Sequence, residues 1–282
     1  MNLHLNTTLL TAFALVAFAA NSIICRMALG NTAIDPASFT TIRLASGAMV
    51  LWVVVRLSPG GKSGGHPGSW WSGVMLFLYA VAFSFAYVSL NAGVGALILF
   101  GSVQATMITA GLMKGERPPV LAWCGLIIAL SGLVYLVFPG LAAPSFSGAA
   151  LMALAGFAWG VYSLRGLGST NPVAVTQGNF LRSVPMTAAV SMIMLSSFSL
   201  SMEGVLLAAL SGGLTSGLGY VVWYAALRHH SATRASMLQL LVPIIAAVGG
   251  VLLLSETVTL RLVLSGILII GGVGLTLKAK QP

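Results

Sequence analysis

The acidic residues of this chain are few, and their positions limit the chemistry that it could perform. There are four: Asp35, Glu116 and Glu256 lie at the ends of apolar stretches, and Glu203 begins one. A carboxylate in the middle of a membrane helix would indicate a proton relay, and paired carboxylates would indicate acid–base catalysis. The sequence has neither arrangement. We expect Glu116 and Glu256 to cap or tether loops, and we expect no proton antiport through a membrane carboxylate.

The sequence also lacks the motifs of soluble enzymes and metal sites. There is no phosphate-binding P-loop, no His-Glu-x-x-His pair and no plausible Ser-His-Asp set. Cys25 and Cys124 have no metal-ligand neighbours, so we interpret both as small buried hydrophobic residues. We therefore predict no enzyme activity, no catalytic residues, no metal and no cofactor.

Aromatic residues recur at helical spacing and predict a binding pocket. Tyr79, Phe83 and Tyr87 are four residues apart, which places them along one face of a helix. Many membrane aromatics only face lipid or the interface. Several of these, however, lie in stretches with small residues that allow close helix packing, and an aromatic-lined pocket suits small amphipathic molecules. The aromatic residues that we expect to contact a substrate are Tyr79, Phe83, Phe100, Trp159, Tyr162, Tyr220 and Trp223.

Buried amides could supply the polar groups of such a pocket. An amide inside a bilayer needs a partner, either a neighbouring helix or a ligand. We expect Asn21, Gln177 and Gln239 to contact a substrate, and the other polar side chains available to the pocket are Ser22, Gln104 and Asn179. For any single amide the neighbouring helix is the safer interpretation. Several amides together favour a wetted cavity.

Two arginines and two prolines complete the candidate residues, in structural or gating roles. Arg43 and Arg182 lie a few residues inside apolar stretches, where each must either reach the interface or face a polar cavity. An arginine in a cavity would suit a carboxylate, and a tether near the helix end is the equally open alternative. Pro185 and Pro243 would kink their helices.

Composition identifies the class of protein. Charged residues make up 6% of the chain and hydrophobic residues 58%, whereas about a quarter of the residues in an ordinary globular protein are charged. Because a membrane helix needs about 20 apolar residues, 282 residues allow about ten helices. We expect the first stretch to remain as a helix, since the residues before it lack the Lys and Arg of a signal peptide. The predicted spans are residues 7–29, 36–57, 70–90, 93–113, 119–138, 146–165, 173–197, 203–227, 233–253 and 260–277.

The distribution of basic residues predicts the orientation of these spans. A net charge of +9 would suggest nucleic-acid binding in a soluble protein, but here we expect no nucleic acid as partner. The basic residues gather after the second, fourth, sixth and eighth spans and at the C-terminus, whereas the opposite side holds only Arg26 and Arg261. The positive-inside rule then places both termini in the cytoplasm, which requires an even number of spans.

The chain also contains an internal repeat. Glu116 and Glu256 each follow an apolar stretch and precede a Gly-rich one, about 140 residues apart. Five spans per half is an odd number, so the second half must lie upside down relative to the first. We therefore predict an all-α, polytopic membrane protein of ten transmembrane helices in a 5+5 inverted repeat, with residues 1–140 and 141–282 as its two parts. Inverted repeats enclose a midplane site in many carriers.

The order of these features resembles a known family. The residues that carry the resemblance are Asn21 with Arg26, Pro36 with Arg43, Trp159-Gly-Val-Tyr162, Gly115-Glu116 with Gly125 and Gly132, Ser255-Glu256 with Gly266 and Gly272, and Pro243. Together they resemble the EamA-type ten-helix members of the drug/metabolite transporter superfamily. Val103 departs from the pattern, because a counterpart of Pro243 would be expected there.

The resemblance implies transport. It implies export of amino acids, including aromatic ones, or of related metabolites, which we expect to occur across a bacterial inner membrane. The inverted repeat predicts alternating access, and the absence of a carboxylate in mid-membrane predicts facilitated or weakly coupled transport. The alternative is a broad multidrug exporter of amphipathic or cationic compounds; a membrane-embedded enzyme or a scaffold fits the residues less well. The expected partners are a small-molecule substrate and the lipid bilayer, and the oligomeric state stays open.

Overall fold

The computed structural model describes residues 3–30, 34–57, 68–113, 119–138, 143–166, 169, 171–227, 238–239 and 241–278. The helices are α1 (Leu3–Gly30), α2 (Pro36–Leu57), α3 (Trp70–Tyr87), α4 (Ala92–Met113), α5 (Val120–Val137), α6 (Phe146–Gly166), α7 (Pro172–Ile193), η1 (Leu195–Ser197), α8 (Met202–Leu210), η2 (Ser211–Leu218), α9 (Gly219–Leu227), α11 (Leu241–Leu254) and α12 (Leu260–Lys278). Within these ranges the only β structure is an isolated bridge between Ile34 and Leu200.

Six helical segments are long and apolar enough to cross a bilayer, and α5, α11 and α12 are shorter apolar helices. In hydrocarbon a helix satisfies its own backbone hydrogen bonds, which explains why apolar runs of this length fold in this way. The predicted polytopic helical class is confirmed. α8, η2 and α9 together form a single span, Met202–Ala226.

Two helices end earlier than the sequence predicts. α3 stops at Tyr87 rather than near residue 90, where the Arg26 guanidinium donates to the carbonyls of Tyr87 and Val88. α7 stops at Ile193, because the following segment turns to pair with the start of α2. There Ser199 exchanges backbone and side-chain hydrogen bonds with Asp35, which also caps α2.

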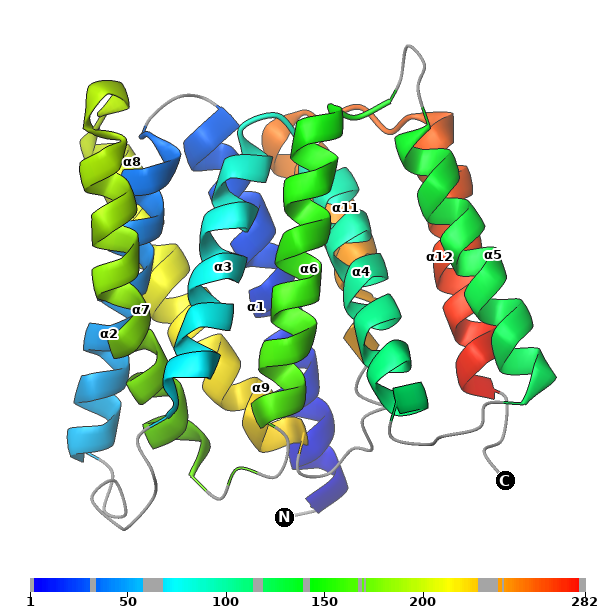
Figure 1. The fold of residues 1–282 in the computed structure, drawn as a ribbon, viewed down its shortest axis with the longest axis horizontal. Helices are drawn as coiled ribbons and strands as arrows, with labels where there is room; N and C mark the ends of the chain where they lie inside the picture. Colours follow the sequence, from blue (N-terminus) through cyan, green and yellow to red (C-terminus); the bar gives the residue numbers. More distant parts are fainter. Residues whose placement is uncertain are drawn as a thin grey trace.

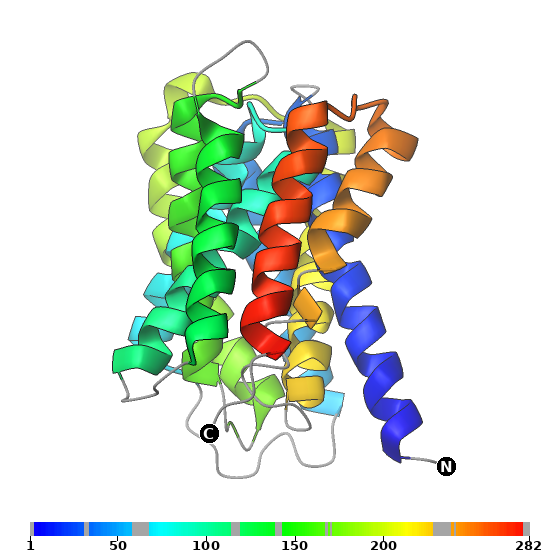
Figure 2. The same ribbon diagram turned by 90° about the vertical axis from the view of Figure 1, so that its right-hand side faces the viewer.

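The helices run roughly parallel in one bundle (Figure 1). α2 and α7 lie together at one edge and α5 and α12 at the other, with α3, α6 and α4 between them. α1 begins and α12 ends at the same end of the bundle, which both views show (Figures 1 and 2).

The α5–α12 pair is held by direct backbone contact, because a Cβ on Gly125 would meet the Gly272 carbonyl. This pair lies at the edge of the bundle. Cys124 on α5 is consequently exposed, contrary to our prediction, whereas Cys25 is buried.

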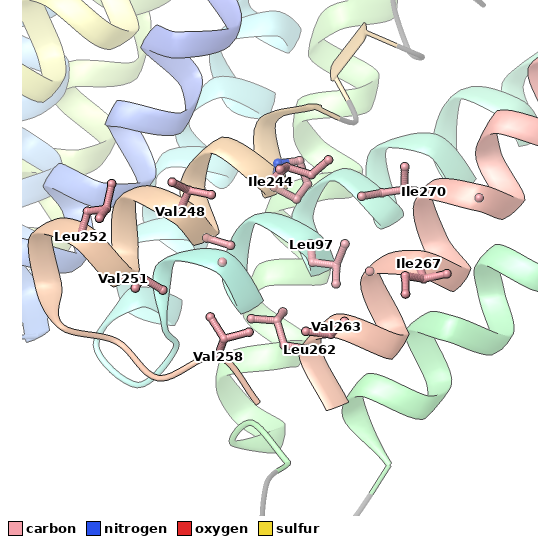
Figure 3. Close-up of a pocket in the computed structure, with 15 residues that line it drawn as sticks. Leu97, Ile244, Val248, Val251, Leu252, Val258, Leu262, Val263, Ile267 and Ile270 are labelled. Atoms are coloured by element: carbon pink, nitrogen blue, oxygen red, sulfur yellow. The ribbon is translucent and has the colours of Figure 1, made fainter. Parts of the chain in front are cut away.

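Between α12 and its neighbours α4 and α11 lies an apolar groove of about 680 Å³ (Figure 3). Its lining consists of aliphatic side chains, proline and glycine, with Leu97, Ile244 and Ile267 among them. A groove without polar side chains offers nothing to orient a polar solute. It therefore does not qualify as the candidate site.

Candidate functional site

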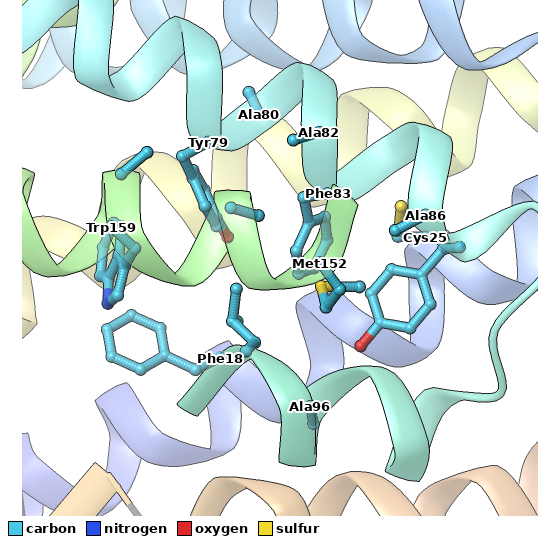
Figure 4. Packing of buried hydrophobic residues seen from close by; sticks show 14 of the residues in the cluster. Phe18, Cys25, Tyr79, Ala80, Ala82, Phe83, Ala86, Ala96, Met152 and Trp159 are labelled. Carbon is cyan, nitrogen blue, oxygen red and sulfur yellow. The ribbon is translucent and has the colours of Figure 1, made fainter. Parts of the chain in front are cut away.

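The centre of the bundle is filled by a cluster of aromatic rings, which we call the aromatic cluster: Phe18, Tyr79, Phe83, Trp159 and Tyr220. Trp159 on α6 lies 4.6 Å from Tyr220, 5.1 Å from Tyr79 and 5.6 Å from Phe18, measured between ring centroids. Tyr79 and Phe83 are 5.3 Å apart along one face of α3. Figure 4 shows Phe18, Tyr79, Phe83 and Trp159 close together among the buried side chains. Edge and tilted ring pairs at these distances are favourable contacts.

The aromatic cluster borders a small cavity. Its lining comprises the five ring residues with Asn21, Ser22, Leu99 and Phe100, and its volume is about 10 Å³. That volume accommodates about one water molecule. A solute of amino-acid size therefore requires the rings to separate, so the site is closed in this conformation.

Asn21 on α1 joins the aromatic cluster to the irregular middle of the eighth span. Its Oδ1 accepts hydrogen bonds from Ser211 at 2.7 Å and Thr215 at 3.1 Å, both in the π-helix η2. Its Nδ2 donates to the Tyr79 hydroxyl at 3.4 Å. π-Helical segments within α-helices occur frequently at functional sites. Here the segment aims several hydroxyls at a single amide oxygen.

Arg43 lies beside the aromatic cluster and is completely buried. Its Nε donates to Ser216 at 3.1 Å, and its Nη2 donates to the hydroxyls of Tyr79 at 3.2 Å and Tyr220 at 3.3 Å. The guanidinium carbon is 4.9 Å from the centroid of the Phe83 ring. Nη1 is buried and has no hydrogen-bond partner among the described residues. None of the acidic residues in the described ranges lies within ion-pair distance of Arg43.

The remaining predicted aromatic residues surround this centre. Phe100 lines the cavity, Tyr162 stacks on Trp159 with centroids 5.6 Å apart, and Trp223 packs against Phe18. The Trp159 indole N–H donates to Gln239 Oε1 at 3.3 Å.

The other predicted residues that the structure describes are not members of the aromatic cluster. Arg182 is half-buried, donates to the Gly178 carbonyl and covers the Trp70 ring. Pro185 lies inside α7, and Pro243 lines the apolar groove. Glu116 falls outside the described residues. Gln177 is half-buried on α7.

Glu256 takes part in a contact between three chain segments. Its carboxylate accepts the Ala92 N–H at the start of α4 and pairs with Arg26 at the end of α1, Nε to Oε1 3.5 Å. This contact, which we call the Arg26–Glu256 latch, joins one end of the first span to the loop before the last.

Sequence reasoning missed several members of the site. Phe18 contacts three rings, and Ser211 and Thr215 bind Asn21. Asn179, one of the amides that the sequence offered, donates to the Tyr162 hydroxyl. The spacing of Ser211 and Thr215, four apart in a Gly-rich segment of an apolar span, was the available signal. Phe18 offered none.

Comparison with known proteins gives the family. A model described as the EamA-like transporter family matches residues 146–278. An uncharacterized protein of Pseudomonas aeruginosa is 47% identical, covering 96% of this chain and 94% of its own. The chain belongs to the EamA-like transporter family. Members of this family are transporters and not enzymes.

More distant relatives agree with membership of the EamA-like family. Two uncharacterized transporters of Archaeoglobus fulgidus are 28% and 26% identical, covering 98% and 84% of this chain and 98% and 87% of their own. A solved crystal structure superposes with a TM-score of 0.72 at 18% identity, over 98% of this chain and 99% of that one, which shows a shared fold. In an EamA-like transporter, a buried ring cluster with a closed cavity is a candidate place for the solute.

Proposed function

We propose that this EamA-like transporter exports amino acids, aromatic ones among them, and related small metabolites from a bacterial cytoplasm across the inner membrane. The observation that carries the proposal is the aromatic cluster around a closed cavity. Its rings come from α1 and α3 in the first half of the chain and from α6 and α9 in the second. Flat apolar bodies stack well on such rings, and few polar groups are needed for orientation.

The mechanism that we propose is alternating access between two inverted five-helix repeats, residues 1–140 and 141–282. The packing of the helices supports it. α2 packs on α7, α4 on α11 and α5 on α12, while α3 packs on α6 as α1 packs on α9. A two-fold axis relating spans one to five with spans six to ten would produce these pairs.

Contacts at both ends of the bundle support a closed intermediate in such a cycle. The Arg26–Glu256 latch lies at one end. At the opposite end Arg165 donates to Ser72 and Ser69, and Asn179 accepts the Ser69 N–H at 2.9 Å. Each set ties together segments from both halves, so opening toward one side requires one set to separate while the other remains.

We propose further that both ends of the chain face the cytoplasm. The basic residues that the sequence places on that side support this orientation. The arrangement of α1 and α12, whose outer ends share one side of the bundle, is compatible with it (Figure 1).

Flux into liposomes containing the purified protein tests the function. A panel of labelled amino acids should show uptake that protein-free liposomes lack, with aromatic members transported. Alanine at Trp159, Tyr79 or Phe83 should each lower this flux by roughly tenfold or more, since each removes ring contacts and buried area. Trp123→Ala and Tyr135→Ala are matched controls, because both side chains are exposed on α5. Unchanged flux in all three cluster variants would remove the proposed site.

Cationic drugs belong in the same panel, as the test of the multidrug alternative. The buried charge of Arg43 beside the aromatic cluster, with no described carboxylate near it, disfavours cations. Drug transport exceeding amino-acid transport would replace our proposal with that alternative.

A further inference from the structure

Within the part of the chain that the structure describes, the positive charge of Arg43 has no counter-charge. All its hydrogen-bond partners, the hydroxyls of Ser216, Tyr79 and Tyr220, are neutral. Arginine cannot be deprotonated in proteins, and its side chain here is completely buried. A buried charge is normally paired, because desolvation is costly and hydroxyls compensate for only part of it.

Two buried N–H donors at the aromatic cluster have no acceptor among the described residues. Arg43 Nη1 and the Trp223 indole nitrogen are both buried without a hydrogen-bond partner. Asn21 Oδ1, which also contacts the Arg43 partner Ser216, already accepts from Ser211 and Thr215. Unpaired buried donors are rare in folded proteins. Two of them next to the aromatic cluster call for an acceptor, and the arginine makes an anionic acceptor favourable.

We propose that Arg43 binds the carboxylate of the transported solute, and that the site takes organic acids with an aromatic or apolar body whether or not they carry an amino group. This inference rests on the proposed function, since it requires that the solute enter the aromatic cluster. A planar guanidinium matches a carboxylate in a way that a hydroxyl cannot.

The amino group is dispensable because the described part of the site offers no carboxylate to hold it. The described acidic residues Asp35, Glu203 and Glu256 cap or begin helices at the ends of the bundle. Gln239 Oε1 already accepts from Trp159. The carboxylate is therefore the group of the solute that the site recognises by charge, and the aromatic rings contact its apolar body.

The wild-type protein tests this without any substitution. Three labelled compounds share one ring and differ in charge: phenylalanine, phenylpyruvate, which lacks the amino group, and phenylalaninamide, which lacks the carboxylate. Net flux is measured against protein-free liposomes, and binding to purified protein is followed by quenching of tryptophan fluorescence. We expect phenylalanine and phenylpyruvate to be transported and bound, and the amide to be about 10- to 100-fold weaker, as the loss of a charge-assisted hydrogen bond implies.

Variants of Arg43 test whether this residue causes the preference for the acids over the amide. Arg43→Gln should remove most of the preference for the acids over the amide, and Arg43→Lys, which keeps the charge but loses the fork, should retain part of it. Arg56→Gln is the control, because Arg56 lies exposed on the same helix over Trp52, and it should keep the full preference. Monodisperse elution and helical circular dichroism establish that each variant is folded.

The possible outcomes separate this inference from the proposed function. Equal binding of the amide and the two acids by wild-type protein would overturn the role of Arg43, even if amino acids are transported. A preference for acids that survives Arg43→Gln in folded protein would overturn it as well. Selective, Arg43-dependent binding of the acids without flux of any compound would support the carboxylate site and contradict the transport function.

Discussion

Arg26 and Glu256 form an ion pair between the end of α1 and the loop before α12, with Arg26 Nε 3.5 Å from Glu256 Oε1. Both side chains also satisfy backbone groups of the turn between α3 and α4. Arg26 donates to the carbonyls of Tyr87 and Val88, and Glu256 accepts the Ala92 N–H. This ion pair therefore also provides hydrogen-bond partners for backbone groups at the end of α3 and the start of α4, which lack partners within their own helices.

Substitution of Glu256 should destabilise the protein in proportion to what is removed. Glu256→Ala removes both the ion pair and the acceptor for Ala92, and should lower the free energy of unfolding by about 0.5–2 kcal/mol, as the loss of a helix cap does. Glu256→Gln keeps an acceptor and should cost less. Thermal unfolding of the purified protein in detergent measures both.

Glu203→Gln is the control for these variants, because Glu203 is exposed in the first turn of α8. It should shift the unfolding midpoint little. The latch would lose its structural role if Glu203→Gln and Glu256→Ala proved equally destabilising.

Gly212 lies where α2 and η2 touch, and we predict that it does not tolerate a side chain. A Cβ there would collide with the carbonyl oxygen of Arg43 and with Ser46 Oγ. Gly212→Ala should therefore destabilise the protein by about 1–3 kcal/mol, as overpacking does, and should lower flux by displacing Arg43.

Gly266→Ala on α12 is the matched control, since a Cβ there meets no described atom within 4 Å. It should be neutral or stabilising by up to about 1 kcal/mol. Equal effects of the two on unfolding would contradict the close approach.

Flux should persist when the proton gradient across the liposome membrane is collapsed with an ionophore. The described carboxylates lie at helix ends, where Asp35 accepts backbone N–H groups of α2 and Glu256 that of Ala92. No described carboxylate reaches the aromatic cluster to carry a proton across. Flux measured with and without ionophore at equal substrate gradients decides this, and strict dependence on the proton gradient would refute facilitated transport.

Cysteine labelling should place Leu57 and Val88 on opposite sides of the membrane. Leu57 is the last residue of α2 and Val88 follows α3, so the two lie at opposite ends of the bundle, and both are exposed. In a Cys124→Ser background that keeps the buried Cys25, a membrane-impermeant maleimide should label Val88→Cys in intact spheroplasts. Leu57→Cys should react only after lysis. Labelling of Leu57→Cys in intact spheroplasts would reverse the proposed orientation.

Much of the fold could be predicted from local composition. Long apolar runs indicate the spans, and charged residues or Pro and Gly indicate the breaks between them. The spacing of Tyr79 and Phe83 likewise predicts a shared face, since helical geometry fixes it. The amides show the limit of this reasoning. The sequence offered both Gln177 and Asn179 and we chose Gln177 for the site, but on α7 it is Asn179 that contacts Tyr162, while Gln177 is half-buried. The rotation of α7 about its axis is set by its neighbours, and its apolar residues are too evenly spread to indicate it.

The sequence by itself determined that this chain crosses a membrane many times and where its helices lie, because desolvation of the backbone and side chains is a property of each segment alone. Only the tertiary structure decided which polar groups meet. Nothing charged in the local sequence marks the turn between α3 and α4, yet Arg26 and Glu256 reach it from 61 and 164 residues away. Arg43 likewise donates a hydrogen bond to Tyr220, which is 177 residues away along the chain. Such long-range pairings depend on how whole helices pack, which the local sequence does not encode.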